Sequence, residues 1–212
     1  MTSDRTGRPI TTTMWDCGGV FLTNGWDHAA RRKVVEHFGL DVDEFERRHP
    51  EPNDAWERGV IPATVYLQRT VFYKPRTFSQ EEFLAQMRAV SRVLYPEMIE
   101  FVGRLRAAAT PQQEIYLLSN ESRELMAYRI PTFLPGLFDA YLVSAYIGLR
   151  KPQPEFFARA LEIAQRLPGE CIFIDDREEN VAAAAALGIH AIRMESPQQA
   201  IAALAEFGVM AA

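Results

Sequence analysis

Four separate segments of this sequence end in side chains of the kinds that bind or transfer phosphate. They end at Asp16, at Ser119-Asn120, at Lys151 and at Asp175-Asp176. A carboxylate can act as a nucleophile, and further carboxylates can hold a hard cation. A hydroxyl and an ammonium group can hold phosphate oxygens, and glycine amides lie nearby in sequence after Asp16. Together these residue types are what phosphoryl transfer requires.

For these side chains to meet, the apolar segments near them must be neighbouring strands. The segments are short and continuously apolar, which suits a parallel sheet covered on both faces. We expect strands within residues 11–20 and at 114–118, 140–144, 171–174 and 190–194. In open α/β sheets, ligands bind outside the carboxyl ends of the strands, near the point where strand order reverses. The sequence therefore predicts that the four segments deliver their polar groups to one crevice.

Helical patterns separate these strands. They run from Pro96 to Ala109, from Pro154 to Leu167, from the residues after Asp176 to Gly188, and onward from Ser196-Pro197. Proline near the start, acidic residues in the first turn and glycine at the end are typical helix boundaries. Strands that alternate with helices of this length predict an α/β fold with a doubly wound, mainly parallel, Rossmann-like sheet.

Residues 26–94 contain no convincing strand, and their helical periodicity is broken repeatedly by glycine and proline. This stretch interrupts the alternation directly after the first strand, so we interpret it as a small helical cap. The predicted organisation is a flexible tail at 1–10, a core at 11–25 and 95–212, and a cap at 26–94. The chain should hinge where cap and core meet, near residues 21–25 and 95–96.

Composition and charge limit the classes of binding partner and the cellular compartment that suit this sequence. The net charge is -5, which favours neither nucleic acid nor an anionic membrane surface. No apolar run reaches the roughly 18 residues that a membrane-spanning helix needs. Two cysteines, Cys17 and Cys171, do not make a disulfide framework, which favours the cytoplasm. A homodimer is compatible with the small cap, but no heptad pattern argues for one.

The four segments, taken in order, resemble a known set of motifs. They read Asp16-Cys-Gly-Gly-Val, Leu118-Ser119-Asn120, Arg150-Lys151-Pro152 and Phe173-Ile-Asp175-Asp176, the last followed by Asn180. This order and spacing, over roughly residues 12–194, is similar to that of the haloacid dehalogenase-like hydrolase superfamily. The helical insert stands where that family's helical-cap members carry theirs. The branch that it most resembles is that of sugar-phosphate phosphatases of the α-glucose-1-phosphate type.

The resemblance implies a Mg²⁺-dependent phosphatase that acts on a small phosphorylated metabolite. Asp16 would attack phosphorus and form an aspartyl-phosphate. The resemblance assigns the metal to Asp16, the carbonyl of Gly18, Asp176 and, through water, Asp175. The phosphate would be held by Ser119, the Asn120 amide, Lys151, and backbone N–H groups near Cys17 and Gly18.

Gly18 departs from the usual pattern of this family, in which a second aspartate stands at that position. That aspartate protonates the leaving group and later activates water. A glycine carbonyl can bind metal, but it supplies no acid. General acid–base help is worth about 10²–10⁴-fold. We therefore expect good leaving groups to suffer least, unless Asn24, Asp27, Glu121 or a cap residue substitutes.

Three other interpretations remain. A metal-independent 2-haloacid dehalogenase would also use Asp16, but the acidic pair Asp175-Asp176 disfavours it. A phospho-receiver module uses similar groups, but its acidic pair comes first in sequence. A degenerate family member that binds phosphate or metal without turnover is the third, and Gly18 is the reason to keep it.

Substrate selection should depend on the cap, which closes over the site. The candidate substrate-facing residues of the cap, which no further sequence feature supports, are Arg47, Arg48, Trp56 and Arg58.

Overall fold

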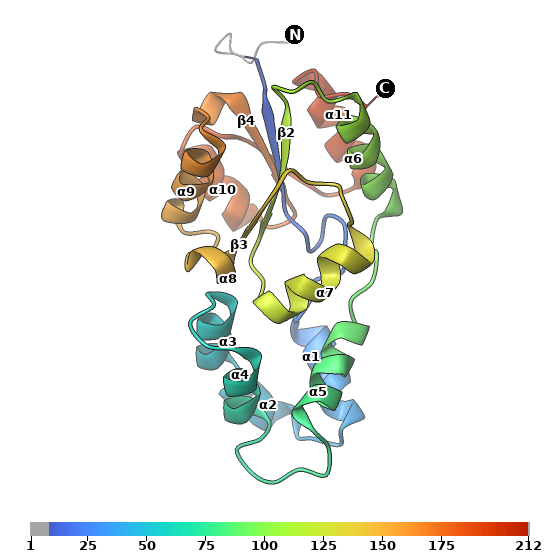
Figure 1. The fold of residues 1–212 in the computed structure, drawn as a ribbon, viewed down its shortest axis with the longest axis vertical. Coiled ribbons are helices and arrows are strands. Elements are labelled where there is room, and N and C mark those ends of the chain that lie inside the picture. Colours follow the sequence, from blue (N-terminus) through green and yellow to red (C-terminus); the bar gives the residue numbers. More distant parts are fainter. Residues whose placement is uncertain (1–8, 212) are drawn as a thin grey trace.

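The computed structural model describes residues 9–211, and within them five strands form one sheet (Figure 1). They are β1 (Thr12–Trp15), β2 (Glu114–Ser119), β3 (Ala140–Val143), β4 (Cys171–Asp175) and β5 (His190–Arg193). The spatial order is β3-β2-β1-β4-β5, and every neighbouring pair is parallel. The chain moves outward from β1 first on one side and then on the other, so strand order reverses at β1. The five predicted strands and the doubly wound α/β fold are confirmed.

Helices cover both faces of the sheet (Figure 1). One face carries α6 (Pro96–Ala108), α7 (Arg123–Phe133) and α11 (Pro197–Glu206), and the other carries α9 (Pro154–Ala164) and α10 (Glu178–Ala186). Successive strand side chains point to opposite faces. Trp15 and Leu117 therefore join one buried cluster, while Met14 and Leu118 join the other. Two shorter elements, α8 (Ser144–Ile147) and the 3₁₀ turn Pro168–Glu170, lie in the connections.

Five helices lie between β1 and α6 and form a separate group at one end of the molecule (Figure 1). They are α1 (His28–His37), α2 (Val42–Arg48), α3 (Pro50–Glu57), α4 (Ala63–Thr70) and α5 (Gln80–Ala89). We call them the helical insert. Their own apolar cluster is rich in aromatic rings, with Trp56 stacked on Tyr66 at 4.4 Å between centroids. Leu125 of α7 also belongs to this cluster, so the insert packs directly on the sheet-bearing part.

Polar contacts add to this packing. One carboxylate oxygen of Glu124 in α7 accepts the indole N–H of Trp56 at 2.9 Å, and the other accepts the Ala63 backbone N–H at 2.9 Å. The Ser144 hydroxyl donates to the Glu57 carbonyl at 2.5 Å. The Arg150 guanidinium forms an ion pair with Glu57 at 2.7 Å. These contacts fix α3 and the start of α4 relative to the strand ends.

Several local expectations can be compared with the structure. Ser196 caps α11 by accepting the Gln199 N–H at 3.2 Å, and the helix begins at Pro197, in agreement with the start predicted at Ser196-Pro197. The prediction that the helix from Pro154 continues to Leu167 is wrong, because Gln165 turns into the left-handed region at φ 53°. The predicted tail at 1–10 lies outside the described residues except for its last two positions. The cap boundaries at 26 and 94 stay predictions.

No helix in the described range of 9–211 is long and apolar enough to cross a membrane.

Candidate active site

Asp16 lies directly after β1, the strand at which strand order reverses. Its backbone N–H donates to the Ile174 carbonyl at 2.9 Å, which extends the pairing of β1 with β4 by one residue. The residue is 7% exposed, and its carboxylate contacts the Lys151 Nζ atom at 2.8 Å. Burial raises the pKa of Asp16 to about 7, although the Lys151 ammonium acts in the opposite direction. Such a carboxylate gains strongly from a cation that comes close to it.

Lys151 is a buried cation between two carboxylates. Its Nζ atom contacts Asp175 at 2.6 Å as well as Asp16, and it donates to the Leu118 carbonyl at 2.9 Å. Burial alone would lower the pKa of Lys151, but the two carboxylates outweigh it and the pKa is raised. Lys151 therefore stays charged and holds the end of β1 to the end of β4.

Asp175 and Asp176 have different surroundings although they are adjacent. Asp175 is fully buried at the end of β4, and its oxygens accept from Lys151, from the Asn180 side chain at 3.0 Å and from the Arg177 N–H at 2.9 Å. Asp176 faces the cavity, and its buried Oδ1 atom has no hydrogen-bond partner in the described part of the chain. Burial first, and Asp175 second, raise the pKa of Asp176.

Asp16, Asp175 and Asp176 can each offer an oxygen to one point, because their carboxylate oxygens lie within 4.8 Å of one another. The turn after β1 permits this approach at Gly19. A Cβ atom at Gly19 would lie 2.2 Å from an Asp176 oxygen, and Gly19 has φ +73°. These three carboxylates, one of which has a buried oxygen without a hydrogen-bond partner among the described residues, form the hard donor set that Mg²⁺ prefers. The residues present thus fit the metal that the sequence implies.

Ser119 and Asn120 follow β2 and line the same cavity. The Asn120 side chain and the Lys151 backbone form two reciprocal hydrogen bonds, of 2.7 and 2.8 Å. The Asn120 carboxamide is therefore committed to positioning Lys151, which leaves its backbone N–H as the group for a ligand. Ser119 is 3% exposed at the strand end.

Cys17 does not present its side chain to the cavity. The thiol is buried in the apolar cluster under the sheet, and burial raises its pKa to about 11. Gly18, in contrast, lines the cavity. Of the residues predicted from sequence, Asp16, Gly18, Ser119, Asn120, Lys151 and Asp176 share this cavity, and Asp175 lies just beneath it. Their catalytic roles stay predictions.

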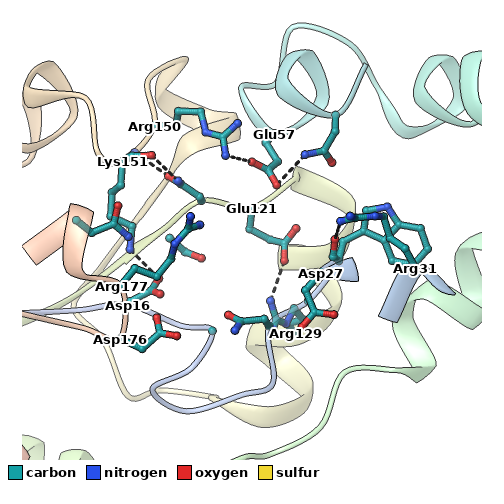
Figure 2. A pocket seen from close by; sticks show the side chains of 18 residues that line it. Asp16, Asp27, Arg31, Glu57, Glu121, Arg129, Arg150, Lys151, Asp176 and Arg177 are labelled. Carbon is teal, nitrogen blue, oxygen red and sulfur yellow. Dashed lines mark hydrogen bonds and ion pairs between the residues drawn. The ribbon is translucent and has the colours of Figure 1, made fainter. Parts of the chain in front are cut away.

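The cavity has a volume of about 410 Å³ and lies between the strand ends and the helical insert (Figure 2). The insert contributes mainly polar side chains: Asp27, Arg31, Asn53 and Glu57, with Trp26 beside them. None of the candidate cap residues named from sequence, Arg47, Arg48, Trp56 and Arg58, lines it. Asn53 and Glu57 stand one helical turn apart on α3, a spacing that places both on one face. The sequence carries no signal that this face, rather than another, meets the strand ends.

A buried ion pair beside the cavity was also not predicted. Arg129 of α7 is 1% exposed and contacts the Glu121 carboxylate at 2.8 Å (Figure 2). It also donates to the Thr23 carbonyl at 2.5 Å. Glu121 additionally accepts from the Ser122 N–H at 2.9 Å. Glu121 is thus held in a structural network, which disfavours it as the substitute acid considered from sequence.

Several known proteins are similar to this chain. Acyl-CoA dehydrogenase family member 10 of Mus musculus is 32% identical over 114 residues, which are 50% of this chain and only 10% of that protein. Sesquiterpene phosphatase astK of Aspergillus oryzae is 27% identical, covering 83% of this chain and 85% of the relative. The chloroplast flavin mononucleotide hydrolase 1 of Arabidopsis thaliana is 29% identical over 83% of this chain and 70% of its own length.

Solved structures share the fold. A haloacid dehalogenase family enzyme of Bacteroides thetaiotaomicron superposes with a TM-score of 0.76 at 21% identity, over 90% of this chain and 96% of the other. The wild-type form of the same enzyme has also been solved in complex with magnesium and inorganic phosphate, with a TM-score of 0.69. A defluorinating L-2-haloacid dehalogenase gives 0.65 at 18% identity, over 94% and 87% of the two chains.

The family model of haloacid dehalogenase-like hydrolases matches residues 11–188, a range that includes strands β1 to β4 and all the site residues that follow them. With the motifs now gathered at one cavity of the predicted fold, the chain belongs to the haloacid dehalogenase-like hydrolase family.

Proposed function

We propose that this protein is a Mg²⁺-dependent phosphomonoester hydrolase that acts through an aspartyl-phosphate at Asp16 on a small phosphorylated metabolite. The observation that carries the proposal is the group of three carboxylates within 4.8 Å at the strand ends, with the Lys151 ammonium on two of them. Two similar proteins, the sesquiterpene phosphatase and the flavin mononucleotide hydrolase, are hydrolases of phosphate esters by name.

In this proposal Asp16, Asp176 and the Gly18 carbonyl hold Mg²⁺, with Asp175 acting through water. Asp175 suits an indirect role, because its oxygens already accept from Lys151, Asn180 and Arg177. The similar Bacteroides enzyme has been crystallised with magnesium and phosphate, which supports the same choice of metal here. When bound, Mg²⁺ supplies positive charge to the phosphoryl oxygens as negative charge develops on them.

The side chains of this chain then perform two steps. Asp16 bonds to phosphorus while the bond to the leaving-group oxygen breaks, and water later hydrolyses the aspartyl-phosphate. Ser119 and the Asn120 N–H hold the phosphoryl oxygens throughout. The Lys151 ammonium, whose three N–H groups meet Asp16, Asp175 and the Leu118 carbonyl, acts as a point charge that offsets the charges of the phosphate and of Asp16. The helical insert covers the cavity and limits the access of bulk water.

The cavity favours a polar leaving group. Its lining is dominated by charged and amide side chains from both parts of the chain, and Trp26 is the large aromatic residue among them. An isoprenoid chain, as in the substrate named for the sesquiterpene phosphatase, would leave these polar groups unpaired. A phosphorylated sugar or a compound of similar polarity would pair with them, in agreement with the sugar-phosphate resemblance.

The test is phosphate release from para-nitrophenyl phosphate and a panel of sugar and acyl phosphates, with Mg²⁺ or with EDTA. We expect Mg²⁺-dependent release that the Asp16→Asn variant lowers by at least about 10³-fold, since it removes the nucleophile. Release that persists in Asp16→Asn would exclude this mechanism. Mg²⁺-independent release of halide from a 2-haloacid would instead favour the dehalogenase alternative.

A second candidate is a non-catalytic member that binds phosphate and metal. Gly18 favours it, since the chain has no carboxylate at the position of the usual acid–base group. Binding of Mg²⁺ and inorganic phosphate without release from any panel compound would support this candidate.

We further propose that the protein acts in the cytoplasm, because its two cysteines are free and buried. We expect neither nucleic acid nor a membrane as a partner, and a homodimer is compatible with this proposal.

A further inference from the structure

Asn24 occupies the space in front of Gly18. An ideal Cβ atom built on Gly18 would lie 2.5 Å from the Oδ1 atom of Asn24. In an aspartate, the carboxylate oxygens lie about 2.4 Å from their own Cβ, as bond lengths of this kind dictate. The Asn24 oxygen is therefore about as far from that point as the oxygens of an aspartate at residue 18 would be. Both residues line the cavity that contains Asp16.

The segment that carries Asn24 is held on both sides. The Thr23 N–H donates to the Arg92 carbonyl at 2.9 Å, and the Thr23 carbonyl accepts from buried Arg129 at 2.5 Å. On the other side, a Cβ at Gly25 would lie 2.6 Å from Glu121 and 2.7 Å from Arg129, so this backbone packs closely on the ion pair. The Arg129–Glu121 pair thus helps to fix the backbone on either side of Asn24, which gives a role to a buried charge pair that phosphoryl transfer itself does not use.

We propose that the Asn24 carboxamide takes the place of the side chain absent at residue 18 and hydrogen-bonds the reacting oxygen atoms without transferring a proton. This inference rests on the proposed function and specifies how its site works. An amide offers two N–H donors and an acceptor oxygen, but it does not ionise in the range of a carboxyl group. It can therefore orient and stabilise, and it is no general acid or base.

The two steps then balance as follows. Asp16 forms an oxygen–phosphorus bond, the electron pair of the broken bond stays on the leaving-group oxygen, and an Asn24 N–H donates to that oxygen. The leaving group takes its final proton from water. In the second step a water molecule that donates to Asn24 Oδ1 bonds to phosphorus, the bond to Asp16 breaks, and the proton of that water passes to solvent.

This arrangement predicts the substrate class by leaving group. Because no residue protonates the departing oxygen, acyl, aryl and anomeric sugar phosphates should react far faster than simple alkyl phosphates. The aspartyl-phosphate should also accumulate, since water attacks it without a general base.

The experiment compares the wild type with Asn24→Asp and Asn24→Ala on phosphates of graded leaving-group pKa, from para-nitrophenyl phosphate to glycerol phosphate. We expect Asn24→Asp to raise the alkyl-to-aryl ratio of kcat by at least 10-fold and to lower the phospho-enzyme fraction trapped by acid quench. We expect Asn24→Ala to lower kcat about 10-fold with little change in KM. Asn53→Asp adds the same charge to the same cavity from α3, and it should not reproduce this rise in the ratio.

The possible results distinguish a failure of the proposed role of Asn24 from a failure of the proposed phosphatase function. Asp16-dependent hydrolysis with the same alkyl-to-aryl ratio in wild type and Asn24→Asp, or the same rise in Asn53→Asp, would overturn the role of Asn24 and leave the proposed function intact. No Asp16-dependent hydrolysis in the wild type would overturn both. Thermal unfolding of each variant, with a midpoint near that of the wild type, shows that the comparison concerns the site and not the fold.

Discussion

At the scale of single residues, Gly18 and Asn24 form a matched pair. An ideal Cβ atom at Gly18 would lie 2.5 Å from the Oδ1 atom of Asn24, so a side chain at residue 18 and the present Asn24 carboxamide exclude each other. A side chain at residue 18 must first displace the Asn24 carboxamide, since contacts of 2.5 Å between a Cβ and an oxygen are not tolerated. This steric relation makes the effect of restoring an aspartate depend on residue 24.

We therefore expect Gly18→Asp alone to give a small gain or a loss, and Gly18→Asp with Asn24→Ala to hydrolyse alkyl phosphates faster than the wild type. A well-placed general acid is worth about 10²–10⁴-fold, and the lower end suits a site not selected for it. Steady-state kinetics with glycerol phosphate and Mg²⁺ measure both variants, and Asn24→Ala alone is the control. If the single and double variants have equal rates, the side chain of Asn24 does not obstruct residue 18.

His49 shows a different effect of burial, away from the cavity. Trp26 donates to the Tyr66 hydroxyl at 2.6 Å, and that hydroxyl lies 2.9 Å from the His49 Nδ1 atom. The hydroxyl has one proton to donate, and neutral Nδ1 can accept it. Burial, with nearby Arg31, lowers the pKa of His49 to about 4. The folded protein thus keeps this ring neutral at a pH where an unfolded chain protonates it.

Stability should consequently fall as the pH drops from about 6.5, the ordinary value, towards 4. In that window only the unfolded chain binds the proton, so this group lowers the free energy of unfolding by up to about 3 kcal/mol. Urea unfolding of the wild type and His49→Gln between pH 7.5 and 4.5 tests this, since the difference between the two proteins removes the effect of other groups. We expect the advantage of the wild type to shrink at low pH, and parallel curves would contradict it.

At the scale of elements, the sequence predicts the strands of the sheet and several of the helices between them. Continuous apolar strands and the helices between them specify β1 to β5, α6 and α10, and parallel strands bring their carboxyl ends to one edge. Asp16, Ser119, Lys151 and Asp175 could therefore be placed together without a structure. Helix α7 was not predicted, because Pro131 within it and an almost uniform polarity around its surface conceal the helical pattern.

Helix α7 also contributes to the contact between the helical insert and the sheet-bearing part. Glu124 accepts from the Trp56 indole and from the Ala63 N–H at the start of α4, which lacks a side-chain cap of its own. Carboxylates at a helix N-terminus interact favourably with its unpaired N–H groups. One side chain thus both caps an insert helix and orients α3, the helix that carries Asn53 and Glu57.

We expect Glu124→Ala to destabilise the protein by about 1–3 kcal/mol, because it leaves a buried indole N–H and a helix-start N–H unpaired. It should also raise KM for the best phosphate substrate, as α3 loses its orientation. Glu97→Ala is the matched control, since Glu97 is an exposed carboxylate in the first turn of α6. Equal unfolding midpoints for the two variants in urea would show that the Glu124 contacts contribute nothing measurable.

At the scale of the whole molecule, the cavity exists only because two independently patterned parts meet. The strand ends supply Asp16, Lys151 and Asp176 to it, and the side of the insert supplies Asp27, Arg31 and Glu57 (Figure 2). Under the proposed function, the first group meets the phosphate and the second meets the rest of the substrate. The sequence predicts that an insert follows β1, but which of its faces meets the sheet depends on long-range packing, such as Leu125 entering the insert's apolar cluster. This is why Arg31, Asn53 and Glu57 were not predicted as lining residues, while Asp27 was named from sequence only as a possible substitute acid.

Because the three carboxylates meet only in the folded protein, the free energy of unfolding should report whether Mg²⁺ binds to them. Asp16 and Asp176 come from opposite ends of the sequence, and each has a pKa raised by burial, so the folded protein keeps together carboxyl groups that repel each other when ionised. A divalent cation that binds all of them binds the folded chain and not the unfolded one. Mg²⁺ at 100 times its dissociation constant should then add about 2.7 kcal/mol to the free energy of unfolding.

For a chain of this length, that corresponds to a rise of about 5–10 °C in Tm. Differential scanning calorimetry with Mg²⁺ or EDTA measures the rise without relying on turnover. Asp176→Asn should abolish it, because the neutral side chain removes the carboxylate whose Oδ1 atom lacks a partner. Asp43→Asn, at an exposed position in the first turn of α2, should preserve it. An equal rise in both variants would place the Mg²⁺ ion elsewhere, because stabilisation by the ion at the strand ends requires the carboxylate of Asp176.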